Sequence, residues 1–279
     1  EKALNINPEY ILAQSSLAIL NFSNPKNEIE ALSESYKSLD LLSKKEANNN
    51  TIRISTLKHD VGQAEFLINN NIKNNKILDF YNKGKEIVEM AKGNKVVNLN
   101  EKKLKKIFKD YRELSFYYKT LEIKSYLNKE NNWKEIENNY LKSNPEFVII
   151  DQFLSNECIN ELRKFCLYSK VFLKEYKNNY LGAFGNTGFT SKVHLGIATD
   201  LQEHMPNIFG KKSLNHMWAF KYDSKLGSGI NVHADFAKVN LNFWITPDEY
   251  NLNKETGGLK VCDKPAPDSW TFEKYNSGN

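Results

Sequence analysis

The chain has 279 residues, of which 40% are hydrophobic, 12% aromatic and 26% charged. This length allows one large domain or two ordinary ones with hydrophobic cores, and the composition excludes a disordered or fibrous protein. The net charge is +5, but the only arginines are Arg53, Arg112 and Arg163. Because nucleic-acid binding depends heavily on the arginine guanidinium, we predict a solvated lysine surface and no nucleic-acid partner.

The sequence also excludes two other classes of protein. No apolar run approaches the roughly 20 residues that cross a bilayer, so we predict no membrane partner. Cys158 and Cys166 lie eight residues apart in a helical pattern. That spacing is about 12 Å along a helix axis, too far for a disulfide. Reduced thiols and a cytoplasmic location are therefore expected.

Residues 1–143 have helical periodicity. Asn7 and Pro8 predict a helix start, and apolar residues recur at helical spacing up to Leu20. The opening Glu1–Leu4 is partly repeated at Tyr36–Leu39, 35 positions later, which is close to the 34-residue period of tetratricopeptide (TPR) repeats. We predict an all-helical, TPR-like region with further helices over 27–42, 56–69, 76–92 and 101–128.

Residues 144–279 have a different pattern, which makes the predicted fold class α+β. Phe147–Ile150 is a short β-branched run that predicts a buried strand, and Ser155 predicts the start of a helix. Several short strands and few helices are typical of a sandwich, jelly roll or barrel. Further strands are predicted over 217–222, 229–236, 239–246 and 259–261.

The stretch Gly229–Phe236 carries the residues with the clearest chemistry. In a strand, alternation places Asn231, His233 and Asp235 on one face. An imidazole and a carboxylate two residues apart on a strand can reach one ion at about 2.0 to 2.2 Å each. A second histidine from a facing strand would complete the two-histidine, one-carboxylate set that binds Fe(II) and leaves positions open. On this pattern alone, a histidine and an aspartate on a solvated strand face explain His233 and Asp235 better, and the prediction that they are metal ligands depends on the sequence around them.

The sequence around this pair resembles a known family. The runs Trp218–Ser224, Gly229–Phe236, Asn240–Pro247 and Thr256–Leu259 resemble the first half of an Fe(II)- and 2-oxoglutarate-dependent oxygenase. The resemblance is to bacterial members with a TPR-like helical region before a double-stranded β-helix. It implies a partial double-stranded β-helix over residues 144–279, an oxidoreductase that uses Fe(II), 2-oxoglutarate and O₂, and hydroxylation of an undetermined substrate. A peptide or glycan-bearing substrate is one class of partner it allows.

The resemblance also implies roles for single residues. His233 and Asp235 match the proximal ligand pair, and Tyr222 matches a position whose hydroxyl contacts the co-substrate. Tyr222 is equally well explained as an aromatic core residue. Asn240 and Asn242 match places where an amide holds the co-substrate carboxylate or the outer oxygen of a ligand, although a polar cross-strand pair also explains them.

The third ligand is not among the matched residues. The resemblance places a distal histidine and a basic anchor for 2-oxoglutarate after Asn279, and His194, His204 and His216 precede the pair, which makes them poor substitutes. His59 is expected to be a helix-surface or packing residue. Two alternatives stay open: a non-catalytic, TPR-like partner-binding protein on a degenerate jelly-roll scaffold, and a cupin-type metal site with different chemistry.

Overall fold

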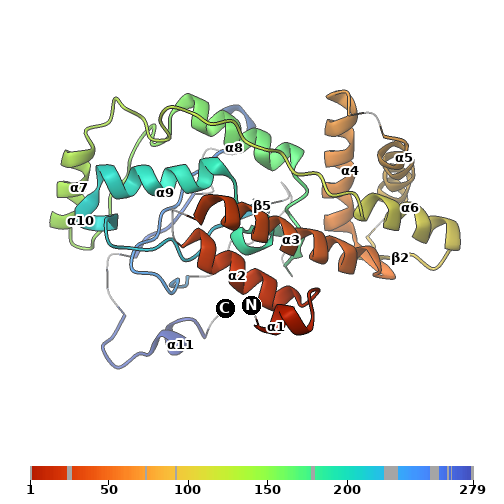
Figure 1. Cartoon of the computed structure of the whole chain (residues 1–279), viewed down its shortest axis with the longest axis horizontal. Coiled ribbons are helices and arrows are strands. Elements are labelled where there is room, and N and C mark those ends of the chain that lie inside the picture. Colours follow the sequence, from red (N-terminus) through yellow and green to blue (C-terminus); the bar gives the residue numbers. More distant parts are fainter. Residues whose placement is uncertain are drawn as a thin grey trace.

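The computed structural model describes residues 2–23, 27–72, 74–91, 93–176, 180–222, 232–251, 258–262, 264 and 266–277. Figure 1 shows helices at both ends of an elongated molecule, with a three-stranded sheet between them. The described elements, in chain order, are α1 (Lys2–Ile6), α2 (Ile11–Phe22), α3 (Glu28–Ala47), β1 (Thr51–Arg53), α4 (Ile54–Asn69), α5 (Asn75–Met90), β2 (Val96–Asn98), α6 (Lys102–Arg112), α7 (Trp133–Lys142), α8 (Asn156–Tyr168), β3 (Lys174–Glu175), β4 (Tyr180–Phe184), η2 (Gly185–Thr187), α9 (Lys192–His204), α10 (Pro206–Phe209), β5 (Trp218–Tyr222), η3 (Asp248–Tyr250) and α11 (Phe272–Tyr275).

The predicted α+β class is confirmed. The described strands form an antiparallel pair, β1–β2, and an antiparallel three-stranded sheet in the order β3–β4–β5. The β1–β2 pair lies inside the region predicted to be all helical. Two sheets this small do not distinguish a jelly roll, so the double-stranded β-helix and the TPR-like arrangement stay predictions.

Several predicted helices are confirmed. α3, α4, α5 and α8 match the predicted helices closely, and the Ser155 hydroxyl caps α8 by accepting from the Cys158 N–H at 3.1 Å. The predicted helix over 101–128 instead ends at Arg112. α9 was not among the predicted helices, and Val193, Ile197 and Leu201 bury one of its faces at a spacing of four residues.

The predicted strands are confirmed only in part. The strand over 217–222 is β5, and its five residues pair with β4. Described residues of the predicted strands over 147–150, 229–236, 239–246 and 259–261 have no strand structure, and residues 223–231 lie outside the described part of the chain. A strand needs a neighbouring strand to satisfy its backbone groups, and local β-propensity does not supply one.

The hydrophobic core is divided along the length of the molecule. One cluster joins α4, α5 and α6 around Phe80, Phe108 and Tyr111. A second joins α7, α8, α9 and α10 around Trp133 and Leu162, and Val239 and Ile245 pack against it. These two clusters occupy opposite ends of the molecule in Figure 1. The segment that carries the predicted metal ligands is thus attached to the α7–α10 end.

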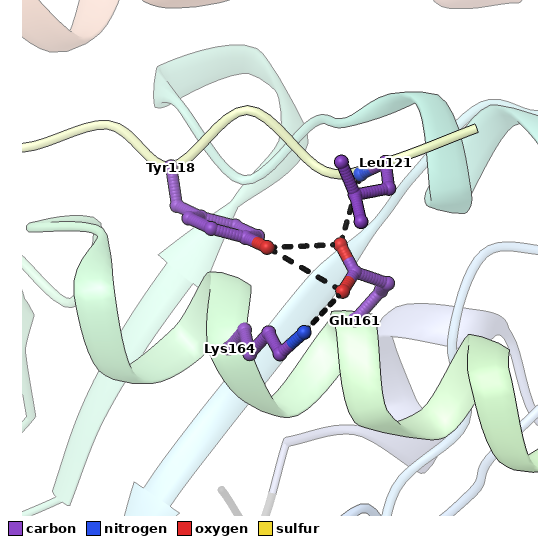
Figure 2. Close-up of polar contacts among 4 residues, drawn as sticks. All are labelled: Tyr118, Leu121, Glu161 and Lys164. Atoms are coloured by element: carbon purple, nitrogen blue, oxygen red, sulfur yellow. Dashed lines mark hydrogen bonds and ion pairs between the residues drawn. The ribbon is translucent and has the colours of Figure 1, made fainter.

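The irregular chain after α6 is fixed to α8 by a buried carboxylate (Figure 2). Glu161 accepts from the Leu121 N–H at 2.8 Å, from the Tyr118 hydroxyl at 3.1 Å and from Lys164 Nζ at 2.8 Å. Burial raises the pKa of Glu161, but these three donors outweigh burial, so the pKa is lowered overall. Glu161 therefore helps to hold a segment that has no strand or helix of its own, together with Ser169 and Asp200, which accept from other backbone N–H groups of the segment.

No described helix combines the length and the apolar character needed to cross a bilayer.

Candidate functional site

Tyr222 ends β5, directly before the segment that leads to the predicted ligands. It pairs with Tyr180 of β4, and the two rings stack with centroids 5.3 Å apart. The residue is 50% exposed, so it is not a core residue. Partial burial raises the pKa of its phenol, and neighbouring Tyr180 adds to the increase. Tyr222 therefore offers a protonated hydroxyl at the edge of the sheet.

The other face of β5 contacts the helical region. Lys221 Nζ lies 2.8 Å from His59 Nδ1 on α4. His59 is 8% exposed, which agrees with a packing role rather than a surface position. Burial, and then the charges of Lys221 and Lys170, lower the pKa of His59 well below its usual value, so its imidazole is neutral and Nδ1 accepts. This contact fixes the strand next to the candidate site.

His233 and Asp235 face each other. The His233 Nε2 atom lies 3.8 Å from Asp235 Oδ1, and the two side chains are 38% and 33% exposed. Both residues lie in irregular backbone, and not in the strand that the alternation argument assumed. Asn231, the third residue of that predicted face, lies outside the described residues. The prediction that imidazole and carboxylate share one side agrees with this geometry.

The two asparagines predicted to assist the pair are placed differently. Asn240 Nδ2 donates to Asp235 Oδ2 at 2.9 Å, so the amide holds the oxygen that points away from His233. This is the outer-oxygen arrangement considered from the sequence. Asn242 is exposed two residues further on.

Asn276, at the end of α11, is a residue that the sequence did not single out. Its side-chain oxygen accepts from the Ala234 N–H at 2.9 Å, and its side-chain amide donates to the Ala234 carbonyl at 2.9 Å. Phe272 of the same helix packs on Phe236 with centroids 5.7 Å apart. Ala234 lies between the two predicted ligands, so Asn276 fixes the backbone from which the His233 and Asp235 side chains project. An asparagine 42 residues away has no local sequence signal for this role.

The pair fits part of a metal site. Neighbouring ligands on an octahedral ion at about 2.1 Å lie about 3 Å apart, so a small rotation of either side chain brings the atoms that are now 3.8 Å apart into range. A third His, Cys, Asp or Glu does not join them among the described residues. The described residues therefore offer two ligands, His233 and Asp235, and the Asn240 side-chain amide holds the second of them.

The remaining histidines lie elsewhere. His194 is buried at the start of α9, His204 packs on Trp133, and His216 packs on Trp218. A cavity beside α4 and a surface hollow beside α10 are likewise not lined by any of the five predicted site residues.

Comparison with known proteins gives no match: no protein-family model, curated protein or solved structure is significantly similar to this chain.

Proposed function

We propose that the chain carries two of the protein ligands of an Fe(II) site in a 2-oxoglutarate-dependent oxygenase that hydroxylates its substrate. The observation that supports this most directly is the opposed placement of His233 Nε2 and Asp235 Oδ1, 3.8 Å apart, with Asn240 on the outer carboxylate oxygen. One histidine and one carboxylate are two thirds of the set that leaves Fe(II) open to other ligands. Fe(II), 2-oxoglutarate and O₂, when bound, supply the oxidising chemistry.

In this proposal the residues of the chain bind and orient. His233 offers Nε2, which must be unprotonated to act as a ligand, so metal affinity falls as the pH is lowered. Asn240 holds Asp235 so that Oδ1 stays directed at the imidazole. Asn276 keeps the turn between the two ligands in place. Tyr222 and Asn242 are the proposed contacts of the co-substrate, and a peptide or glycan-bearing molecule is the proposed substrate class.

Metal binding by the chain itself tests the ligand pair. Fe(II) binding is measured by anaerobic equilibrium dialysis for the unchanged chain and for His233→Ala, Asp235→Ala and Asn276→Ala. The first two variants should lose binding, and Asn276→Ala should weaken it about tenfold, because a ligand-positioning contact is worth about that much. His216→Ala removes an exposed histidine outside the pair and serves as the matched control.

Turnover tests the reaction class. The resemblance puts the third ligand after Asn279, so 2-oxoglutarate consumption is measured with a longer gene product that contains it. His233→Ala should abolish consumption while leaving thermal unfolding unchanged.

Equal Fe(II) binding by the unchanged chain and by both ligand variants would refute the metal site. The alternative of a non-catalytic partner-binding protein would then be favoured.

A further inference from the structure

The outer side of α2 carries leucines where a surface helix normally has polar residues. α2 packs on α3 and η2, and its buried residues include Gln14 and Ser15. The large hydrophobic residues that it exposes are Leu12 and Leu20, which are 67% and 66% exposed. A helix that packs on the protein with one side only usually has charged or polar residues on the other side. Since polar residues lie inside and leucines outside, we expect another surface to cover the outer side of α2.

The exposed residues form a pattern that is the same in both directions along the helix. Leu12, Ser16 and Leu20 follow one another at intervals of four residues, so they lie on one ridge of the helix surface. Each leucine is about 6 Å from Ser16 along the helix axis. The Ser16 hydroxyl donates to the Leu12 carbonyl at 2.8 Å, so its proton is already bonded within the helix. The centre of the ridge is therefore small and can be covered without losing that hydrogen bond.

The surroundings of this ridge are also apolar. α2, Ile11–Phe22, contains no charged residue. Figure 1 shows α1 and α2 on the lower side of the molecule, below α3 in this view. The neighbouring helices each expose an isoleucine, Ile6 in α1 and Ile29 in the first turn of α3, which are 87% and 78% exposed. Interface cores are depleted of charged residues, and α2 itself offers no charge for a charged partner to pair with.

We propose that a second copy of this chain covers α2, so that the α2 helices of two copies pack antiparallel across a two-fold axis at Ser16. Leu12 of each copy then contacts Leu20 of the other, and the small Ser16 side chains meet at the axis. An interface with two-fold symmetry uses the same patch twice and needs a self-complementary surface, which the Leu12–Ser16–Leu20 ridge provides. Two ridges with this spacing pack with their helix axes inclined by about 50°.

The same arrangement uses the two exposed isoleucines. Antiparallel packing brings the α1 end of one copy, with Ile6, towards the start of α3 in the other copy, with Ile29. None of the proposed iron-site or co-substrate residues lies on this surface, so the proposal does not depend on the oxygenase activity.

Sedimentation equilibrium of the full chain tests self-association. It is measured from about 1 μM to 1 mM, which covers weak and standard interfaces, and we expect a dimer with a Kd of about 100 μM or lower. Leu12→Glu and Leu20→Glu should each raise this Kd about a hundredfold or more, because each substitution places a carboxylate in the interface twice. Leu141→Glu is the matched control, since Leu141 is an exposed leucine on α7 and should leave the Kd unchanged.

Cysteine cross-linking tests the symmetry. The exposed Cys262 is first replaced by serine, so that it does not compete. Under mild oxidation, Ser16→Cys should form a disulfide between copies, because the two-fold axis places residue 16 beside itself. Leu12→Cys and Leu20→Cys should cross-link well when mixed and poorly alone.

Three outcomes would overturn the proposal. They are a monomer at every concentration, a dimer whose Kd both glutamate variants leave unchanged, and cross-linking of Ser16→Cys that is no better than that of Leu12→Cys alone. A monomer would favour a helix of another protein as the surface that covers α2.

Discussion

The buried imidazole of His194 should lower the free energy of unfolding of the protein in mild acid. Its Nδ1 atom lies 2.7 Å from the Ser191 hydroxyl, and its ring packs on Phe189 and Phe165 with centroids 4.5 and 5.3 Å away. Ser191 also accepts from the His194 N–H, so its hydroxyl proton is free to be donated to Nδ1. The ring proton then sits on Nε2, which has no hydrogen-bond partner among the described residues. An added proton would have to enter this apolar setting.

The size of the effect follows from the pKa difference between the folded and unfolded states. Burial lowers the pKa of His194 from 6.5 to about 3 in the folded protein. Between these two values the unfolded chain binds a proton at this residue and the folded chain does not, so stability is present above pH 6.5 and is lost as the pH falls. At pH 5 the loss is about 2 kcal/mol, a value set almost entirely by the unfolded-state pKa.

The assay is urea unfolding at pH 7.5 and pH 5 for the unchanged chain and for His194→Asn, whose amide can keep the Ser191 contact. The variant should be less stable at pH 7.5, but its disadvantage should shrink by about 2 kcal/mol at pH 5. His204→Asn, at the exposed end of the same helix, is the control and measures the effect of replacing an exposed histidine. His59 and Asp60 titrate in both proteins and cancel in the comparison. An equal stability difference at both pH values would refute the reasoning.

Two further predictions concern packing and the buried carboxylate. A methyl group at Gly196 would overlap the Tyr126 ring, whereas one at Gly62 meets nothing within 4 Å. Gly196→Ala should therefore destabilise by about 2 kcal/mol or more in thermal unfolding, and Gly62→Ala, also in a helix, should stabilise by about 0.5 to 1 kcal/mol. Destabilisation by both would contradict the argument. Glu161→Gln puts an amide donor among three donors and should cost about 2 kcal/mol in urea unfolding, and exposed Glu157→Gln on the same helix should cost much less.

Local signals predicted some helices well but not all: Asn7 and Pro8, expected at a helix start, lie between α1 and α2, and α2 begins at Ile11. Ser155 caps α8 as expected, and α4 and α5 begin and end within two residues of the predicted bounds. The predicted helix over 101–128 instead stops at Arg112, because the chain beyond is held by side chains such as Glu161. α9 was missed, although its own apolar residues recur every four positions.

The sequence argument expected His233 and Asp235 to lie side by side, and their role as metal ligands stays a prediction. The opposed placement of His233 and Asp235 agrees with the sequence argument, although the strand on which that argument depended is absent from the described residues. The cavity beside α4 had no such signal. Ser43, Asp60, Arg112 and Lys170 lie in separate parts of the chain, and each alone is an ordinary helix or loop residue. Only packing brings them together.

The cavity beside α4 and the ligand pair differ in how the fold holds them. The cavity lined by Ser43, Asp60, Arg112 and Lys170 is bounded by buried residues of three helices and of the chain after α8. The ligand pair depends on two side-chain amides: Asn240 holds the carboxylate, and Asn276 holds the backbone at Ala234. Exposed amide contacts of this kind are each worth about 1 kcal/mol and compete with water. Metal binding at His233 and Asp235 should therefore order this segment as well as occupy it, so Fe(II) should protect the Ala234 N–H from hydrogen exchange in the unchanged chain and not in His233→Ala.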